Sequence, residues 1–234
     1  MLPWVCCWAG ELKTARQNNH STRRIRDLFI AILALLLLWP LMIVIGLTVF
    51  LCSGAPIIYR EGRMSRGEGR FTIYKFRTMW AGEESFYHVA PDNDPRITRL
   101  GLWLRRWRLD ELPQLFNILR GDMSIVGPRP LHAKNAAAIP ESKLKRILSV
   151  APGITGRGAL EFLEEDHCLA QLSNPEKVFL EKLLPARIER ELEYLDDPDP
   201  CKDWRIIWET LTTLWFSQAR HKSEKLVKDI ISTN

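Results

Sequence analysis

The strongest constraint on the fold is an apolar run, residues 28–52, that contains no charged side chain. As a straight helix rising 1.5 Å per residue it would be about 37 Å long, enough to cross a hydrocarbon core of about 30 Å. Such a run belongs in a membrane. Hydropathy alone therefore favours a single membrane span.

The charges around this run and the proline in its middle favour a different topology. Basic residues flank it on both sides: Lys13, Arg16, Arg23, Arg24 and Arg26 before it, and Arg60, Arg63, Arg66 and Arg70 after it. Positively charged flanks tend to stay in the cytoplasm. Pro40 divides the run into halves of about 18 Å, which are too short to span but sufficient to enter, bend and return. We predict a re-entrant helix broken at Pro40, although proline kinks also occur in spanning helices.

A second stretch, residues 108–131, carries the densest set of chemical groups. Asp110 and Glu111 precede an apolar stripe of helical spacing, and Pro113 is compatible with a helix there because it falls in the first turn. The carboxylates are therefore expected at a helix N-terminus, where the helix dipole favours negative charge. One interpretation makes Asp110 an ordinary N-cap and Glu111 a first-turn acid. The other makes them part of a phosphate site bridged by a cation.

The surrounding arginines favour an anionic substrate. Six lie close in sequence to the acidic pair: Arg99, Arg105, Arg106, Arg108, Arg120 and Arg129. Arg129 stands between two prolines in a Gly-Pro-Arg-Pro sequence, so the loop has little flexibility to lose on binding. Scattered histidines, and the lack of a Gly-x-Ser-x-Gly or Walker-type sequence, weaken the metal-cluster and hydrolase alternatives. We therefore expect phosphate binding through arginines, a helix end and Mg²⁺, with Glu111 as metal ligand and Asp110 as carboxylate nucleophile.

The remaining sequence predicts one small domain of the α+β class, predominantly helical. We divide the chain into a basic segment at 1–27, the membrane helix at 28–52, a cytoplasmic catalytic domain at 53–218 and a charged tail at 219–234. Residues 57–59 and 71–76 predict a β-hairpin, residues 80–95 a loop that could serve as a substrate flap, and residues 152–156 a turn. The tail is expected to fray.

Amphipathic helices are expected at 97–109 and 142–150, after Pro175 with a kink or break at Pro185, and from Asp203 onward. Tryptophans in these segments could lie at the level of the lipid headgroups: Trp103, Trp107, Trp204, Trp208 and Trp215. The net charge is +5. The basic residues of the chain are concentrated beside the apolar run and the acidic pair. This placement fits binding of anionic lipid and a phosphorylated substrate better than binding of a nucleic acid.

Three motifs together resemble the bacterial sugar transferase family: Asp110-Glu111 joined to the Gly-Pro-Arg-Pro loop, Lys-Phe-Arg-Thr-Met at 75–79, and Pro-Gly-Ile-Thr-Gly at 152–156. Members of this family are small monotopic polyprenol-phosphate phosphoglycosyl transferases. The resemblance implies transfer of a sugar phosphate from a nucleotide sugar, usually a UDP-sugar, to undecaprenyl phosphate with release of UMP. It implies the first membrane step of cell-surface polysaccharide or glycoconjugate assembly, at the cytoplasmic face of the bacterial inner membrane. It also allows a homodimer.

The resemblance assigns roles to individual residues. It makes Asp110 the nucleophile of a covalent phosphosugar-aspartyl intermediate, Glu111 the ligand of Mg²⁺ on the diphosphate, and Arg129 a contact of the nucleotide. Further motif positions that bind phosphates or order the site are matched by Lys75, Arg77, Arg105 and Asp203. A non-catalytic membrane scaffold of the same fold, with the acids acting only as caps, is the main alternative.

Two positions depart from the family's pattern. The residue before the helix-breaking proline is usually serine, whereas Trp39 precedes Pro40 here, so a hydroxyl that helps satisfy the broken backbone is missing. After Gly156 the family commonly continues toward Asn-Gly-Arg, but this chain continues with Arg157 and then an acidic stretch through Asp166. Arg157 is therefore the candidate substitute for a phosphate-binding arginine, in a region expected to bear on the choice of sugar.

Overall fold

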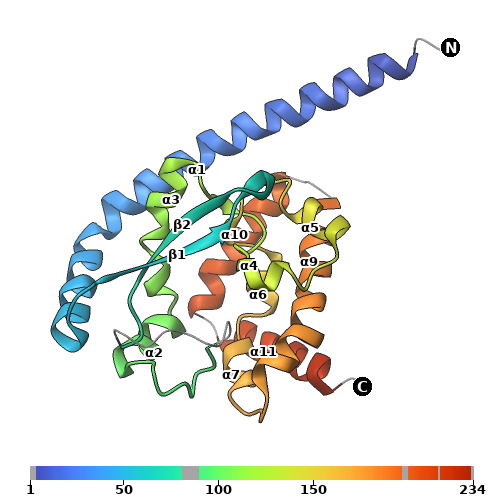
Figure 1. Ribbon diagram of the computed structural model, residues 1–234. Helices are drawn as coiled ribbons and strands as arrows, with labels where there is room; N and C mark the ends of the chain where they lie inside the picture. Colours follow the sequence, from blue (N-terminus) through green and yellow to red (C-terminus); the bar gives the residue numbers. More distant parts are fainter. Residues whose placement is uncertain (1–3, 81–89, 197–199, 216, 233–234) are drawn as a thin grey trace.

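The computed structural model describes residues 4–80, 90–196, 200–215 and 217–232. One long helix, α1 (Trp4–Ser53), runs along one side of a domain in which shorter helices surround two small sheets (Figure 1). The shorter helices are α2 (Arg99–Arg106), α3 (Gln114–Arg120), α4 (Ala133–Ala136), α5 (Glu141–Ile147), α6 (Arg157–Glu161), α7 (Glu165–Leu169), α8 (Pro175–Val178), α9 (Leu184–Asp196), α10 (Pro200–Trp215) and α11 (Ser217–Ser232). The predominantly helical composition is as predicted. The middle of the expected flap, residues 81–89, lies outside the described residues.

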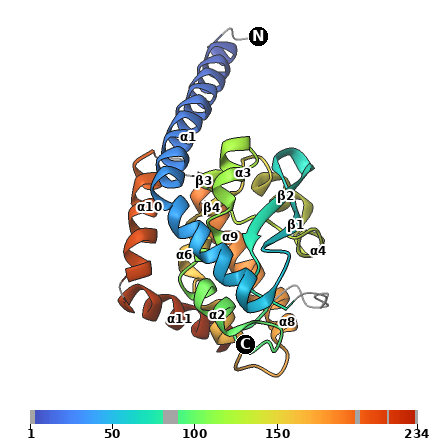
Figure 2. The ribbon, with the colours of Figure 1, turned by 90° about the vertical axis from the view of Figure 1, so that its left-hand side faces the viewer.

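Helix α1 is continuous, and Pro40 lies inside it. The predicted break at Pro40 is therefore not an interruption of the helix. Figure 2 shows the second half of α1 passing across the face of the domain, while its N-terminal turns extend away. Ala31, Ile45 and Val49 are buried against the domain, whereas the opposite side exposes many large apolar side chains. Within the described chain, Ser21–Ser53 is the one helical segment long and apolar enough to cross a membrane.

Charged groups at the start of the apolar run attach α1 to the domain. The Arg24 guanidinium donates to the Ile118 and Leu119 carbonyls at the end of α3. Asp27 is buried and accepts a hydrogen bond from the Ser124 hydroxyl. Because these contacts lie on the polar side of residue 28, they fix the helix just where its apolar part begins.

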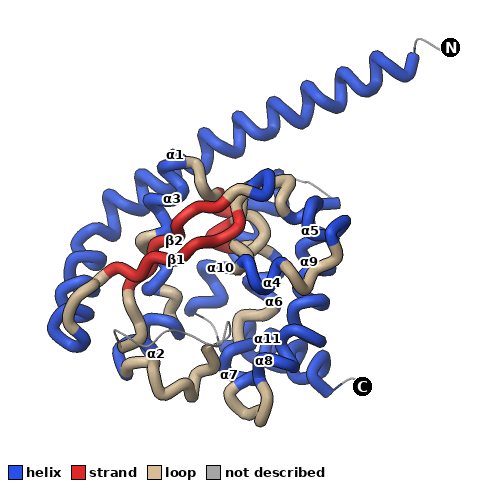
Figure 3. Tube along the Cα trace, viewed as in Figure 1, coloured by secondary structure: helices blue, strands red, loops and turns tan. Residues whose placement is uncertain are grey.

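The predicted hairpin is confirmed. Strand β1 (Ile58–Met64) pairs antiparallel with β2 (Arg70–Phe76), with Ile58 opposite Phe76, and the 3-10 turn η1 (Arg66–Glu68) joins them. Figure 3 shows these strands in red, crossing the centre of the molecule. Phe71 and Ile73 alternate along β2 into the core beside α3. Strand β1 is longer than predicted because its polar residues pair across the hairpin.

The second sheet was not predicted. Strand β3 (Ser124–Val126) pairs parallel with β4 (Gly153–Thr155), in the segment for which the sequence indicated a turn. Its glycines serve a close approach of two backbones: a Cβ added to Gly153 would lie 2.2 Å from the Gly127 nitrogen. This sheet sets the start of the Gly-Pro-Arg-Pro loop against the chain after α5.

The C-terminal helices complete a second core around Phe162, Leu169 and Leu183. A π-helical segment, η3 (Phe179–Leu183), joins α8 to α9 just before Pro185, close to the predicted irregularity. Pro185 lacks an N–H for the regular helical ladder, which accounts for the irregular turn there. The expected fraying of the tail is wrong. Residues 217–232 form α11, and Val227 is fully buried in this core.

Candidate active site

A cleft of about 1430 Å³ lies beside the hairpin and is also lined by residues of α2, α7, α9 and α11. It is larger than the roughly 300–1,000 Å³ typical of pockets for one small ligand. Six of the predicted site residues line it: Lys75, Arg77, Arg105, Asp110, Glu111 and Arg129. Segments far apart in the sequence therefore meet in one cleft, as the sequence motifs suggested.

The acidic pair occupies a tight turn directly before α3. Asp110 and Glu111 belong to the 3-10 turn η2 (Leu109–Glu111), which follows Arg108 in a left-handed conformation with φ of 55°. The N-cap residue of α3 is Pro113, and no side chain caps that helix. Both carboxylates are buried. They lie near a helix N-terminus, as expected, but the interpretation of Asp110 as its N-cap is wrong.

Glu111 is the focus of three basic side chains. Its Oε1 atom lies 3.0 Å from Lys75 Nζ, 3.4 Å from Arg108 Nη1 and 3.9 Å from Arg129 Nη2. Burial alone would raise the pKa of Glu111, but these neighbouring cations outweigh it and hold the pKa well below its usual range. Glu111 is therefore an anion, and one carboxylate faces three positive charges.

Asp110 has a different environment. Burial raises its pKa, the nearby negative charge of Glu111 adds to this, and Lys75, Arg105 and Arg108 act in the opposite direction. Its Oδ1 atom is buried and has no hydrogen-bond partner within the described part of the chain. A buried polar atom without a partner costs stability, so such an atom beside a cleft indicates chemistry rather than folding.

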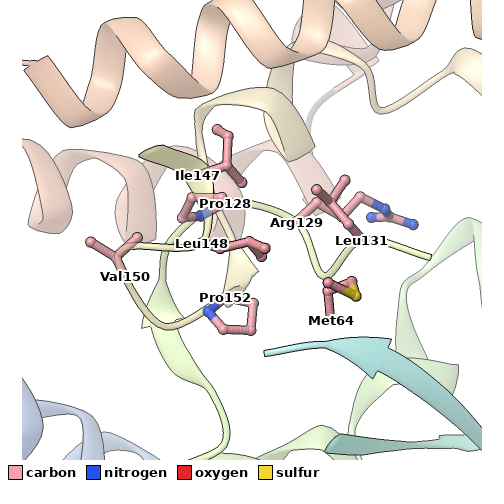
Figure 4. A pocket seen from close by; sticks show the side chains of 8 residues that line it. All are labelled: Met64, Pro128, Arg129, Leu131, Ile147, Leu148, Val150 and Pro152. Carbon is pink, nitrogen blue, oxygen red and sulfur yellow. The ribbon is translucent and has the colours of Figure 1, made fainter. Parts of the chain in front are cut away.

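The Arg129 loop is held by neighbouring backbone. Gly127 N donates to Thr155 O at 2.9 Å, and Gly153 N donates to Pro128 O at 2.8 Å. Behind the loop, Met64, Ile147, Leu148 and Pro152 leave a gap of only about 10 Å³ (Figure 4). The loop backbone thus has little room to move, and the Arg129 side chain extends from it toward Glu111.

Arg105 and Arg77 line the cleft in different ways. Arg105 Nη1 donates to Ala90 O at 3.0 Å, which ties α2 to the chain that precedes it. Arg77 Nη2 donates to Ser53 O at 2.5 Å and to Gly54 O at 2.6 Å, so it holds the C-terminal end of α1. Arg77 therefore links α1 to the strand that carries Lys75.

Two predicted binding residues are not among those that line the cleft. Arg157 pairs with Glu161 at 2.6 Å and Glu209 at 3.6 Å. Asp203 is fully buried and accepts from Arg26 Nη1 at 2.6 Å and from the Tyr194 hydroxyl at 2.5 Å. The structure thus places Asp203 in an ion-pair cluster that joins α10 to α1, apart from the residues around Asp110.

Sequence reasoning missed Arg187 on α9. It is buried, pairs with Glu165, and lies over the rings of Phe162 and Phe179. Burial and the nearby positive charge of Arg129 lower the pKa of Arg187 to about 9. The signal was available in the sequence, because Arg187 falls within the helical stripe formed by Leu184, Ile188 and Leu192. A charge at a core position of an amphipathic helix indicates a buried polar site.

The donor set suits a magnesium ion shared with a substrate. No group of three or more His, Cys, Asp or Glu side chains is placed to hold a metal ion among the described residues. Mg²⁺, however, is commonly bound through one or two carboxylates together with substrate phosphates. Glu111 and the unpartnered oxygen of Asp110 provide such oxygen donors.

Comparison with known protein families matches residues 18–217 to the family described as "Bacterial sugar transferase". The chain is similar to the UDP-glucose:undecaprenyl-phosphate glucose-1-phosphate transferase of Xanthomonas campestris pv. campestris, with 37% identity over 79% of this chain and 37% of the relative. It is 32% identical to the UDP-N-acetylgalactosamine-undecaprenyl-phosphate N-acetylgalactosaminephosphotransferase of Aeromonas hydrophila, over 82% of this chain and 43% of that protein.

For another similar protein, the match covers most of both chains. The exopolysaccharide production protein PSS of Rhizobium leguminosarum bv. phaseoli is 34% identical over 82% of this chain and 94% of its own length. By contrast, the match spans only about two fifths of the Xanthomonas and Aeromonas proteins.

Proposed function

The chain belongs to the bacterial sugar transferase family, and from that premise we propose that it transfers a sugar 1-phosphate from a UDP-sugar to undecaprenyl phosphate and releases UMP. One observation carries the proposal: Asp110 is buried beside the cleft with an unpartnered carboxylate oxygen, next to an acid that faces three basic side chains. Positioning and charge neutralisation are the main needs of phosphoryl transfer, and this arrangement supplies both.

We propose two displacements at one phosphorus atom. In the first, an Asp110 carboxylate oxygen bonds to the β-phosphorus of the UDP-sugar while the bond to the bridging oxygen breaks, and its electron pair leaves with UMP. In the second, a phosphate oxygen of undecaprenyl phosphate bonds to the same phosphorus, and the Asp110 carboxylate leaves with the electron pair of the broken bond. A covalent intermediate divides one difficult transfer into two easier steps.

The basic residues would bind the charged parts of the substrates. Lys75, Arg108 and Arg129 lie around Glu111 and carry more positive charge than that carboxylate compensates, which suits a diphosphate. Burial raises the pKa of Asp110, whereas the charges of Lys75, Arg105 and Arg108 favour its ionised form, the form that attacks. Glu111 would hold Mg²⁺, which supplies further charge neutralisation at the phosphates.

A lipid acceptor is consistent with the exposed apolar surface of α1, which could contact a membrane. We propose that α1 enters and leaves the bilayer on the cytoplasmic side of the bacterial inner membrane, so that the protein is monotopic. The exposed apolar side of α1 supports membrane contact, as do the exposed indoles of Trp103, Trp204 and Trp208. Undecaprenyl phosphate would then present its phosphate at headgroup level, where a soluble nucleotide sugar can meet it.

This topology can be tested with single cysteines. Cys52 is exposed near the end of α1, and Ser21→Cys would place a second thiol before the apolar run. In variants that keep one of these thiols and lack the other cysteines, re-entry predicts labelling of both from the cytoplasmic side. Labelling from opposite sides of vesicles would indicate a spanning helix instead.

The reaction is tested by measuring UMP release from a panel of UDP-sugars with undecaprenyl phosphate and Mg²⁺. We expect lipid-dependent release from at least one sugar, and loss of that release in Asp110→Asn. Asp196→Asn is the matched control, because Asp196 is an exposed aspartate of α9 that does not line the cleft. Full turnover by Asp110→Asn would contradict the nucleophile. Absence of release across the panel by the folded wild-type protein would contradict the reaction.

A further inference from the structure

The side of the Arg129 loop that faces α9 contacts one carboxylate that has no role in the proposed reaction. Arg129 N donates to Glu191 Oε1 at 3.3 Å. Together with the bonds of Gly127 N and Pro128 O to the β4 region, this contact engages three successive residues of the loop. The contacts of Gly127 and Pro128 are made to backbone groups, whereas the contact of Arg129 is made to a side chain.

The space around Glu191 is built for a carboxylate. Glu191 is 1% exposed, and the chain at the start of α6 lies against it. A Cβ added to Gly158 would lie 2.5 Å from Glu191 Oε1, and one added to Gly156 would lie 3.6 Å from Oε2. Any side chain at position 158 would therefore displace the carboxylate, so the glycine there permits the buried contact.

Burial of this group needs an explanation. Glu191 lies in the same helical stripe as Ile188 and Leu192, where an apolar side chain would avoid the cost of removing a carboxyl group from water. Its Oε2 atom has no hydrogen-bond partner among the described residues, so the packing is not arranged to satisfy the group fully. What the carboxylate does provide is an acceptor for two backbone N–H groups, that of Gly158 at the start of α6 and that of Arg129 in the loop.

We propose that Glu191 is a positioning residue for Arg129. By accepting the Arg129 N–H from the side of α9, it fixes the point from which the guanidinium extends into the cleft. It thereby contributes to the binding of a nucleoside diphosphate. The proline on either side of Arg129 limits rotation of the chain, and Glu191 limits its displacement. Preorganisation of this kind increases affinity because less freedom is lost on binding. The inference rests on the proposed function only for the identity of the nucleotide.

The test compares Glu191→Leu and Glu191→Gln in the full-length protein, with Glu193→Gln as control because Glu193 is exposed on the same helix. The probe is UDP, whose dissociation constant is measured by titration calorimetry. We expect about tenfold weaker binding for leucine, which lacks the acceptor, and a change of less than about threefold for glutamine, which keeps it. In turnover, leucine should raise KM for the UDP-sugar more than it lowers kcat.

A double-mutant cycle separates positioning from a general structural role. If Glu191 acts through Arg129, then Glu191→Leu should weaken UDP binding by less than about twofold in an Arg129→Ala background. Multiplicative effects of the two substitutions would overturn the proposal. If the leucine variant does not fold, Glu191→Asp replaces it, since the shorter side chain keeps the charge and loses the reach.

The outcomes also separate this inference from the proposed reaction. UDP binding that depends on Glu191 through Arg129, with no UMP release by the wild-type protein, would contradict the reaction and support the positioning role. UMP release by the wild-type protein, with UDP binding that does not change when Glu191 is replaced, would support the reaction and contradict the positioning role. Failure of the wild-type protein to bind UDP would overturn both.

Discussion

Glu191→Gln is expected to stabilise the protein at alkaline pH and to leave its stability nearly unchanged at acidic pH. Burial raises the pKa of Glu191 to about 7, from an ordinary value of 4.5, against the opposing hydrogen bond from Arg129 N and the positive charge of Arg187. In the unfolded chain the carboxyl group ionises at its ordinary pKa. Ionisation therefore favours the unfolded state at any pH between the two values and above.

The sign and size of the effect follow from this difference. Because the pKa is raised on folding, the stability that Glu191 contributes is fully present below about pH 4.5 and is lost as the pH rises through about 7. At 1.36 kcal/mol per pKa unit, the loss in the free energy of unfolding is about 3 kcal/mol. For a chain of this size that corresponds to a difference in Tm of roughly 6–12 °C.

The assay is thermal unfolding in detergent at a series of pH values from 4.5 to 8.5, with wild type, Glu191→Gln and the exposed-site control Glu193→Gln. Other groups titrate in the same range, so the quantity to follow is the difference between variant and wild type at each pH. The Tm advantage of Glu191→Gln should grow with pH, and Glu193→Gln should show none. Parallel pH profiles for Glu191→Gln and wild type would show that folding does not raise the pKa of Glu191.

Three further predictions concern charged groups, two in the cleft and one in the ion-pair cluster that joins α10 to α1. Arg77→Met should lower the free energy of unfolding by about 1–3 kcal/mol, because the Ser53 carbonyl at the end of α1 loses a charged donor, and unchanged Tm would contradict this anchoring role. Lys75→Met should move the acidic limb of the pH profile of UMP release to higher pH, because the pKa of Glu111 rises when the Lys75 ammonium group is removed. An acidic limb at the same pH as in wild type would argue against an effect of Lys75 on Glu111. Asp203→Asn should lower the free energy of unfolding by about 1–3 kcal/mol, because the half-buried Arg26 and the Tyr194 hydroxyl lose a charged acceptor. The change is measurable as a lower Tm, and a stability equal to wild type would count against the cluster.

The parts of the fold that follow from local sequence pattern were predictable. The alternation of Phe71 and Ile73 places β2 in the hairpin, and the apolar run of α1 requires a long helix with an exposed apolar side. The parallel pairing of β3 and β4 was not predictable in this way. Each strand has three residues, and the glycines that allow their backbones to approach are the same residues that indicate a turn.

The site shows the same division between local and distant information. Asp110, Glu111 and Arg129 lie within one short stretch, and their grouping in the cleft was predicted from their spacing. Roles that depend on distant partners were missed: Asp203 pairs with Arg26 in α1, and Glu191 contacts the Arg129 loop from α9. Spacing along the chain carries no information about such contacts, although a charge within an apolar helical stripe marks the position where one should be sought.

The most direct test of the proposed reaction is to look for the covalent intermediate on Asp110. Wild-type protein is incubated with Mg²⁺ and the UDP-sugar that supports turnover, without undecaprenyl phosphate, and the intact mass and the peptide containing Asp110 are measured. We expect the protein to gain the mass of one sugar phosphate at Asp110, UMP to form in equal amount, and addition of the lipid to remove the modification. Turnover with no adduct on Asp110, or an adduct that persists in Asp110→Asn, would contradict the proposed reaction.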